Sequence, residues 1–277
     1  MAVNRENQKS FSEQFYESSY WLNEALKQPT PELQTFYGIY RPLDYAAQIY
    51  RNFLQKYLNG PKRILFVGMN PSRYGSLQTG IPFGDITTVR DRMQLDVKSL
   101  DSVEIGEEQS SQRFWNLIKA IFNGEEDFID RFFQNCFVHN VCPLVFINNN
   151  GHNVSFESLA ARMTMETMQI EVICKSYLEL QVQLLQPEII IAVGWYAFNM
   201  LRSLDYYKNG RCFVEKIPHP SPKNFDSELD WINACKPKLI NNHRFSEIIQ
   251  SQANENQASN QSNVVCNQYA SMLGLLQ

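Results

Sequence analysis

Short apolar runs alternate with longer amphipathic segments along this chain. The apolar runs cover residues 63–68, 136–140, 188–194 and 212–218, and each contains β-branched or aromatic residues. Short apolar runs of this kind are typical of strands that are buried on both faces of a sheet. We therefore predict four buried core strands.

The segments between and before these runs follow helical spacing. Residues 112–122 and 164–186 place apolar side chains three and four positions apart, and so do residues 12–28 and the segment from Pro42 to Gly60. Strands that alternate with helices predict a sheet covered on both faces and joined by right-handed crossovers. The predicted fold class is α/β, a three-layer α/β/α domain around a central four-stranded, mostly parallel sheet.

Composition divides the chain into one domain and two tails. We expect residues 1–11 to be a flexible N-terminus and residues 12–250 to form a single domain. Residues 251–268 are rich in Ser, Asn and Gln and have almost no apolar content. Such a segment cannot offset the entropy lost on ordering, so we expect residues 251–277 to be a disordered tail.

Composition also limits the class of protein. With 277 residues, 44% of them hydrophobic, the chain can bury a large core. No apolar run reaches the roughly 18 residues that span a bilayer, and the polar N-terminus is unlike a signal peptide. Six scattered cysteines suit reduced core thiols. We expect an intracellular protein without a membrane partner.

The net charge of −4 argues against binding nucleic acid through bulk positive charge. Charge is unevenly distributed, however, and basic residues follow or flank the motif loops described next. A local basic rim therefore stays open as an alternative. Its candidates are Arg73, Arg90, Arg92, Lys216, Lys223, Lys236 and Lys238.

Polar or turn-forming pairs follow every predicted strand. They are Asn70-Pro71, His139-Asn140, Gly194-Trp195 and His219-Pro220. Any one pair can simply begin a turn. The carboxyl ends of parallel strands meet at one crevice, however, and ligands bind there. Because the pairs occur together at one sheet edge, they favour a functional site in which an Asn and a His face each other.

These loops resemble those of the single-strand-selective monofunctional uracil-DNA glycosylases, within the uracil-DNA glycosylase superfamily. The resemblance spans about residues 15–245, and the first and last motifs together are specific. The matching motifs are Gly68-Met69-Asn70-Pro71, Gln78-Thr79-Gly80-Ile81-Pro82-Phe83-Gly84, Val89-Arg90-Asp91, Arg113-Phe114-Trp115, the segment from Cys136 to Leu144, and His219-Pro220-Ser221-Pro222-Lys223-Asn224.

The resemblance implies that Asn70 and His219 are the catalytic residues. Cleavage of an N-glycosidic bond builds negative charge on the departing base, and His219 matches the family's donor to the uracil oxygen that gathers this charge. Asn70 holds the attacking water but cannot take its proton, because an amide does not ionise. Leaving-group stabilisation must therefore dominate.

The resemblance also implies a substrate pocket. Asn140 offers an acceptor for uracil N3–H and a donor for O4, so cytosine would meet mismatched groups. Phe83 stacks on the base face and Met69 lines the pocket. Ser72 borders the C5 side of the base, where relatives often carry Gly, so acceptance of 5-substituted uracils is left open.

The loop after His219 is implied to contact DNA and to hold the helix open after base flipping. Its members are Ser221, Pro222, Lys223, Asn224 and Phe225. Relatives usually have Arg and Pro where this chain has Lys223 and Phe225. Because lysine stacks less well than guanidinium, activity on duplex DNA is expected to differ from the family norm.

Other chemistries have weaker support. A zinc site could be read from Cys136, His139 and Cys142, but alternation along a strand points Cys136 and His139 to opposite faces of the sheet. Asp85 and Asp91 are isolated acids of the kind usually found solvated, and Asp91 is expected to pair with a local Arg. The chain has no Gly-x-Ser-x-Gly elbow for a nucleophilic serine and no glycine-rich phosphate motif for a nucleotide cofactor. No fourth ligand lies near the three zinc candidates and no set of close cysteine pairs suits an iron–sulfur cluster, so no metal and no cofactor is expected.

The sequence thus predicts a monofunctional glycosylase that removes uracil from single- and double-stranded DNA and leaves an abasic site for base-excision repair. No lysine nucleophile is implied, so no strand cleavage is expected. The alternatives are a non-catalytic module that binds damaged or single-stranded nucleic acid and a hydrolase of free nucleosides. We expect a monomer with DNA as its partner, in the nucleus because of the repair role.

Overall fold

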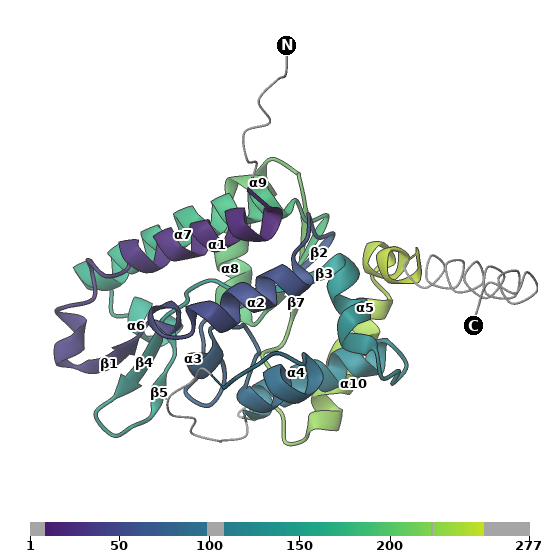
Figure 1. Ribbon diagram of the computed structural model, residues 1–277, viewed down its shortest axis with the longest axis horizontal. Coiled ribbons are helices and arrows are strands. Elements are labelled where there is room, and N and C mark those ends of the chain that lie inside the picture. Colours follow the sequence, from purple (N-terminus) through teal and green to yellow (C-terminus); the bar gives the residue numbers. More distant parts are fainter. Residues whose placement is uncertain (1–8, 99–107, 223, 252–277) are drawn as a thin grey trace, which may run out of the picture.

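The computed structural model describes residues 9–98, 108–222 and 224–251 (Figure 1). Four parallel strands form the central sheet in the order β3-β2-β6-β7. They are β2 (Ile64–Gly68), β3 (Cys136–Asn140), β6 (Ile189–Val193) and β7 (Phe213–Ile217). These are the four strands that the apolar runs predict. Gly68 pairs with Asn140 and Val193 with Ile217, so the carboxyl ends of the strands lie level.

Alternating side chains attach helices to both faces of this sheet. Phe137 of β3 contacts Phe15 of α1 (Phe11–Ala25) and Phe53 of α2 (Ala47–Tyr57) on one face. On the other face Phe66 of β2 contacts Phe114 of α4 (Gln109–Ile121). Successive strand residues point to opposite faces, which explains the division. The predicted three-layer α/β/α fold is confirmed.

Long helices complete the two outer layers. On the face of α1 lies α7 (Met165–Leu185), and beside α4 lie α5 (Phe128–Asn135) and α10 (Glu228–Ile240). The shorter elements are η1 (Leu33–Thr35), η2 (Pro42–Asp44), α3 (Ser76–Thr79), η3 (Thr88–Arg92), α6 (Phe156–Ala160), α8 (Trp195–Ser203) and α9 (Asp205–Lys208).

A second, antiparallel sheet was not predicted. It has the order β1-β4-β5, with β1 (Tyr37–Tyr40), β4 (Val145–Asn148) and β5 (Asn153–Val154). Its strands are too short to show a period along the sequence, and β1 lies about a hundred residues before its partner. A separate small core, which includes Phe146 and Phe156, supports it.

The prediction that all four core strands are buried on both faces was wrong for β7. Its first four residues are partly or fully exposed, whereas the other three strands are buried throughout. β7 is one of the two edge strands and pairs with a single neighbouring strand. Because β3 at the opposite edge is buried throughout, the exposure of β7 also reflects how little the surrounding elements cover it. The adjacent charged residues Glu215 and Lys216 and the exposed Phe213 agree with that position.

The first described helix can be compared with the flexible N-terminus that the sequence predicts. α1 begins at Phe11, inside the range expected to be flexible, and Ser10 caps it by accepting from the Glu13 N–H at 3.2 Å. Residues 1–8 and 252–277 lie outside the described part, so the division into 1–11, 12–250 and 251–277 stays a prediction.

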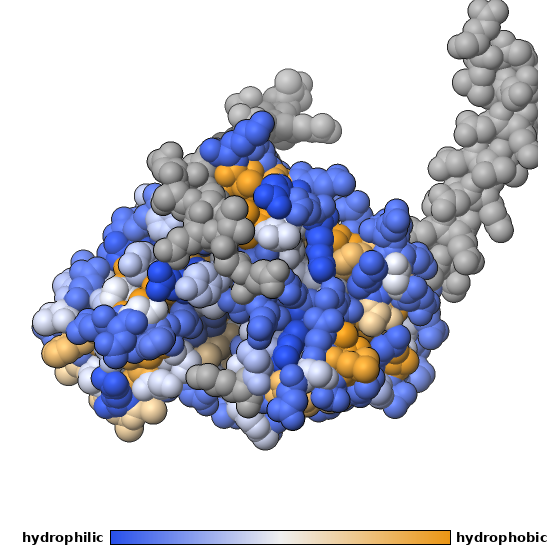
Figure 2. All heavy atoms as spheres, turned by 90° about the horizontal axis from the view of Figure 1, so that it is seen from below, coloured by the Kyte–Doolittle hydropathy of each residue, from blue (hydrophilic) through white to orange (hydrophobic). Residues whose placement is uncertain are grey.

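No helix in the described ranges has both the length and the apolar content to cross a bilayer. The face in Figure 2 is mostly hydrophilic, with hydrophobic residues in separate patches. The five cysteines that the structure describes are buried and free, which agrees with the expectation of reduced core thiols.

Candidate active site

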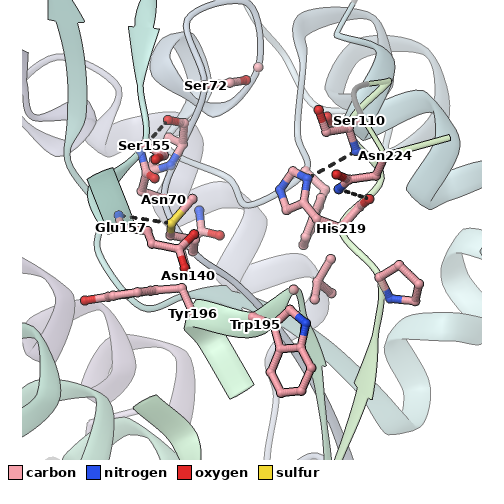
Figure 3. A pocket seen from close by; sticks show the side chains of 18 of the residues that line it. Asn70, Ser72, Ser110, Asn140, Ser155, Glu157, Trp195, Tyr196, His219 and Asn224 are labelled. Atoms are coloured by element: carbon pink, nitrogen blue, oxygen red, sulfur yellow. Dashed lines mark hydrogen bonds between the residues drawn. The ribbon is translucent and has the colours of Figure 1, made fainter. Parts of the chain in front are cut away.

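A cavity of about 1140 Å³ opens at the carboxyl ends of the central strands. The loops after β2 and β7, the end of β3 and the starts of α4, α6 and α8 surround it. Figure 3 shows Asn70 and Asn140 on one side and His219 on the other. The lining includes these predicted site residues: Met69, Asn70, Ser72, Phe83, Asn140, His219, Ser221, Pro222 and Asn224.

One described residue of the predicted DNA-contacting loop, Phe225, does not line the cavity. Lys223 lies outside the described residues. Phe225 is half-buried and packs against the main core instead of projecting into the cavity.

The imidazole of His219 is held in one tautomer. The backbone N–H of Ser221 donates to His219 Nδ1 at 3.1 Å, so Nδ1 must be unprotonated. Burial lowers the pKa of His219 to about 4, and the ring is therefore neutral near pH 7. A neutral imidazole that accepts at Nδ1 carries its hydrogen on Nε2. His219 is therefore a fixed hydrogen-bond donor.

Hydrogen bonds within the loop hold the segment that carries His219. Asn224 Nδ2 donates to the His219 carbonyl at 3.1 Å, and the Asn224 N–H donates to the Ser221 carbonyl at 3.0 Å. Behind the ring, Gly194 has a φ of 98°, a value that L side chains rarely adopt. A Cβ at Gly194 would lie 3.4 Å from His219 Cβ, in ordinary van der Waals contact, so it is the backbone conformation and not lack of space that calls for glycine.

The amide of Asn70 is oriented by three backbone groups. Its Nδ2 donates to the carbonyls of Pro71 at 3.0 Å and Leu144 at 3.4 Å, and its Oδ1 accepts from the Phe156 N–H at 3.1 Å. The second lone pair of Oδ1 is left for a water molecule. Because the Phe156 N–H begins α6, the small antiparallel sheet and its helix help to orient this residue.

Asn140 ends β3 and is only 9% exposed. Its amide makes no hydrogen bond to any residue in the described ranges, although a buried amide normally finds a partner. A ligand in the cavity can supply that partner. The amide offers one acceptor and two donors to such a ligand.

The ring of Phe83 and the amide of Asn140 converge above Gly68. A Cβ at Gly68 would lie 2.6 Å from Asn140 Oδ1 and 3.0 Å from Phe83 Cζ. The opposite side of the Phe83 ring stacks on Phe114, with centroids 4.1 Å apart and an interplanar angle of 10°. Phe83 therefore presents a supported aromatic surface beside the Asn140 amide.

The backbone of Phe83 is strained and firmly held. Its φ is 54°, which is uncommon for a residue with a side chain. The Phe83 carbonyl accepts from Trp115 Nε1 at 2.7 Å and from the Ser111 hydroxyl. Both donors belong to α4, so this helix fixes the position of the aromatic ring.

Ser72 and Met69 are tied to neighbouring loops. The Ser72 hydroxyl donates to Glu108 Oε2 at 2.6 Å, while Glu108 Oε1 accepts from the Ser110 N–H at 3.3 Å at the start of α4. Met69 Sδ accepts from the Glu157 N–H at 3.4 Å.

Sequence reasoning missed several residues of this region. Glu108, Trp195 and Tyr196 line the cavity, and Arg113 holds the loop after β7 by donating to the carbonyls of Pro220 and Phe225 at 3.4 and 3.2 Å. Arg113 was noted only as part of a motif. The position of Trp195 directly after a predicted strand was the available signal for that residue.

Only part of the expected basic rim lies at the cavity. Lys216 and Lys238 line it, whereas Arg73, Arg90, Arg92 and Lys236 do not. Lys216 and Lys238 lie on β7 and α10, on the side of the cavity that also carries His219. The positive charge is therefore concentrated along one edge.

The residues of the rival chemistries have other partners. His139 Nε2 lies 2.8 Å from Gln181 Oε1, and burial lowers the pKa of His139 to about 4. Asp91 pairs with Arg90 at 2.6 Å, as predicted. Asp85 is not solvated, contrary to expectation, because it is 2% exposed and accepts from the Thr88 N–H and hydroxyl. The described residues contain no group of three His, Cys, Asp or Glu that could hold a metal.

Comparison with known proteins places this geometry in a family. The model of the "Uracil DNA glycosylase superfamily" matches residues 55–243. The "Single-strand selective monofunctional uracil-DNA glycosylase" of Rattus norvegicus is 33% identical over 246 residues, which is 83% of this chain and 84% of the relative. The protein of the same name from Mus musculus has the same identity and coverage.

A solved structure supports the fold. The crystal structure of wild-type Pedobacter heparinus SMUG2 superimposes with a TM-score of 0.55 at 22% identity, covering 73% of this chain and 86% of the other.

Proposed function

The chain belongs to the uracil-DNA glycosylase superfamily, and on that premise we propose that it hydrolyses the bond between uracil and deoxyribose in DNA. The product is an abasic site for base-excision repair. Uracil is the main substrate in this proposal, and 5-substituted uracils are its extension. The reaction uses water as the nucleophile and leaves the DNA backbone intact.

His219 drives the reaction by stabilising the leaving group. As the glycosidic bond breaks, negative charge gathers on uracil O2, and the fixed Nε2–H donates to it. Because the donor is already oriented, no group has to reorganise when the charge develops on uracil, and this lowers the activation free energy. Removing one such donor typically costs about 10²- to 10³-fold in kcat.

Asn70 positions the attacking water. Its Oδ1 accepts a hydrogen bond from the water at the face of the sugar opposite the base, where positive charge develops. Because the amide has no ionisable proton acceptor, it orients the water without deprotonating it in advance. The rate depends mainly on how well the departing uracil is stabilised.

Asn140 and Phe83 select the base. Asn140 accepts from uracil N3–H and donates to O4, while the uracil ring stacks on the supported face of Phe83. Cytosine presents an acceptor at N3 and an amino group at C4, so both contacts would fail. A buried polar pair left unsatisfied costs about 1–3 kcal/mol.

The observation that carries the proposal is the hydrogen bond from the Ser221 N–H to His219 Nδ1. It leaves the Nε2–H as the donor at a cavity that also holds the Asn70 amide and the Asn140 amide, which has no hydrogen-bond partner among the described residues.

The test is base excision from an oligonucleotide with a single uracil. The protein is incubated in EDTA with single- and double-stranded forms, and alkali then reveals abasic sites. We expect alkali-dependent cleavage at the uracil, reduced about 10²-fold or more by His219→Ala and strongly by Asn70→Ala. The controls Asn149→Ala and His243→Ala change exposed residues outside the cavity. The same assay with 5-hydroxymethyluracil ranks that base against uracil.

The alternatives give different results. Tight uracil-dependent binding without any product favours a non-catalytic module, whereas release of uracil from free deoxyuridine but not from DNA favours a nucleoside hydrolase. Strand cleavage without alkali, or an adduct trapped by borohydride, contradicts a monofunctional mechanism.

Two further features of the proposal concern the whole protein. We place it in the nucleus, because genomic DNA is the substrate, and imaging of the tagged chain tests this. We also propose a monomer, because one chain contributes every residue invoked above. Sedimentation equilibrium at working concentration tests the mass.

A further inference from the structure

Trp195 is an exposed aromatic residue at the rim of the cavity. It begins α8 directly after β6, lines the cavity and is 62% exposed. Trp115 and Trp231, by contrast, are fully buried. Leaving a large indole in water forgoes the stabilisation that its burial would bring, so its place beside an active-site cavity points to a binding role.

The surroundings of the indole leave one of its faces open. Lys216 Nζ lies over the other face, 2.7 Å from the ring centroid. Phe198 meets the indole nearly edge to face, with centroids 5.7 Å apart and an interplanar angle of 80°. Both neighbours belong to regular elements, β7 and α8, which hold the ring in place.

Lys216 also supplies positive charge, and although the neighbouring Glu215 carboxylate acts on this charge electrostatically, Glu215 forms its ion pair with Lys238 instead. Within the described ranges the Lys216 ammonium group forms no ion pair, whereas the neighbouring Lys238 pairs with Glu215 at 3.0 Å. The protein as a whole carries a net charge of −4. At this place a positively charged group without an ion-pair partner among the described residues lies beside an exposed aromatic ring, although the protein as a whole is negatively charged. Such a pair suits a ligand that carries both a negative charge and a flat ring.

The ligand at this place is not the excised base. In Figure 3 the Trp195 indole projects away from the space between Asn140 and His219. Phe83, on the loop after α3, already provides the aromatic surface next to Asn140. A nucleotide that follows the chain out of the cavity is the group that reaches Trp195.

We propose that Trp195 and Lys216 form a platform for the nucleotide next to the uracil in single-stranded DNA. The neighbouring base stacks on the open indole face, and Lys216 contacts the connecting phosphate. The inference rests on the proposed glycosylase function and adds a strand preference to it. In duplex DNA the neighbouring base stays stacked on its own strand, so only a single strand uses the platform fully.

The platform is tested by changing the protein and the substrate together. Wild type and Trp195→Ala are compared on single strands in which the 5′ or the 3′ neighbour of the uracil is a normal nucleotide or a tetrahydrofuran that lacks a base. Stacking on an aromatic side chain is worth roughly tenfold in binding. We expect Trp195→Ala to raise KM about tenfold on the normal strand, and removal of one neighbouring base to do the same to wild type.

The two changes should not add. Once Trp195 is alanine, removing the same neighbouring base should have little further effect, because the partner of that base is already gone. Trp195→Phe should restore most of the affinity, and duplex substrate should respond much less to any of these variants. Trp21→Ala, which changes another exposed tryptophan far from the cavity on α1, is the matched control.

Lys216 has a separate readout. If its ammonium group contacts one phosphate, Lys216→Met should lower the slope of log affinity against log salt by about 0.7 for single strands. An unchanged slope contradicts the phosphate contact.

Additive effects, or equal losses on single strands and duplex, would overturn the platform while leaving the glycosylase assignment intact. Failure of the proposed function looks different, because wild type would then release no uracil from any strand.

Discussion

A single backbone N–H, that of Ser221, decides which nitrogen of His219 faces the cavity. The same contact predicts how activity responds to acid. The pKa of His219 is lowered from its ordinary 6.5 to about 4, so the ring stays neutral well below neutral pH. Protonation at Nδ1 would break the bond from Ser221 and change the ring from a neutral to a charged donor.

We therefore expect the His219-dependent part of kcat to be flat from about pH 8 to about pH 5 and to change as pH falls through about 4. Single-turnover excision across this range measures it. An inflection near 6.5 that disappears in His219→Ala would contradict the neutral, buried ring.

Gly68 gives a second prediction at this scale. A methyl group there would press on Asn140 Oδ1 and the Phe83 ring, so Gly68→Ala should displace both substrate-reading groups. We expect kcat/KM for uracil to fall about tenfold or more, since a misplacement near 1 Å can cost about a hundredfold. Gly60→Ala is the control, because a Cβ there meets nothing within 4 Å. Unchanged kinetics would mean that the two side chains move aside freely.

Some site residues could be predicted from sequence and others could not, for a physical reason. Asn140 ends β3, and Asn70 and His219 lie two residues beyond β2 and β7, so the parallel sheet alone brings them to one edge. Glu108 and Arg113 act across the fold on partners far away in the chain, and no local pattern encodes such contacts. The position of Phe225 against the core likewise depends on how its loop closes.

At the scale of elements, α4 organises two parts of the site. It binds the Phe83 carbonyl through Trp115 and Ser111, and it binds the loop after β7 through Arg113. Arg113 is 7% exposed, so the carbonyls that it serves have little access to water. Hydrogen bonds from a charged group are worth about 1.5–3 kcal/mol.

Arg113→Met should therefore loosen the loop that positions His219. We expect kcat to fall about tenfold while KM changes less, because a loose donor affects the transition state more than binding. Partial recovery in Arg113→Lys separates positioning from general destabilisation. Arg90→Met removes an exposed arginine paired only with its neighbour and serves as control. If Arg113→Met lowers the melting temperature but leaves kcat unchanged, the positioning role is wrong.

The helices and strands differ in how well their positions could be predicted from the sequence. The buried strands β2, β3 and β6 have continuous apolar runs, which is why their positions were correct within about one residue. β1, β4 and β5 are too short to show periodicity and form only because partners from distant segments pair with them. The exposure of β7 depends on strand order and on how far other elements cover each edge, since β3 at the opposite edge is buried, and local sequence specifies neither.

Across the whole molecule, two buried neutral histidines make stability depend on pH. Burial lowers the pKa of both His139 and His219 to about 4, below the ordinary 6.5 that applies when the chain is unfolded. The unfolded chain therefore binds more protons between these values. The stability contributed by the neutral rings is present above about 6.5 and is lost as pH falls towards about 4.

We expect the free energy of unfolding, measured with urea, to fall between about pH 6.5 and about pH 4, and to fall less steeply in His219→Ala. His243→Ala, at an exposed site, should leave the slope unchanged. Equal slopes for wild type and His219→Ala would show that this ring titrates normally.

The strand order also has a consequence for how the protein is made. Ile64 must pair with Cys136 and with Ile189, and β7 closes the sheet last. A chain emerging from the ribosome therefore acquires Asn70, Phe83 and Asn140 long before the loop that bears His219. Such distant pairings form slowly. Until synthesis passes β7, the nascent chain holds the base-reading half of the site without the group that expels the base, so excision begins only after β7 has joined the sheet and the His219 loop has formed.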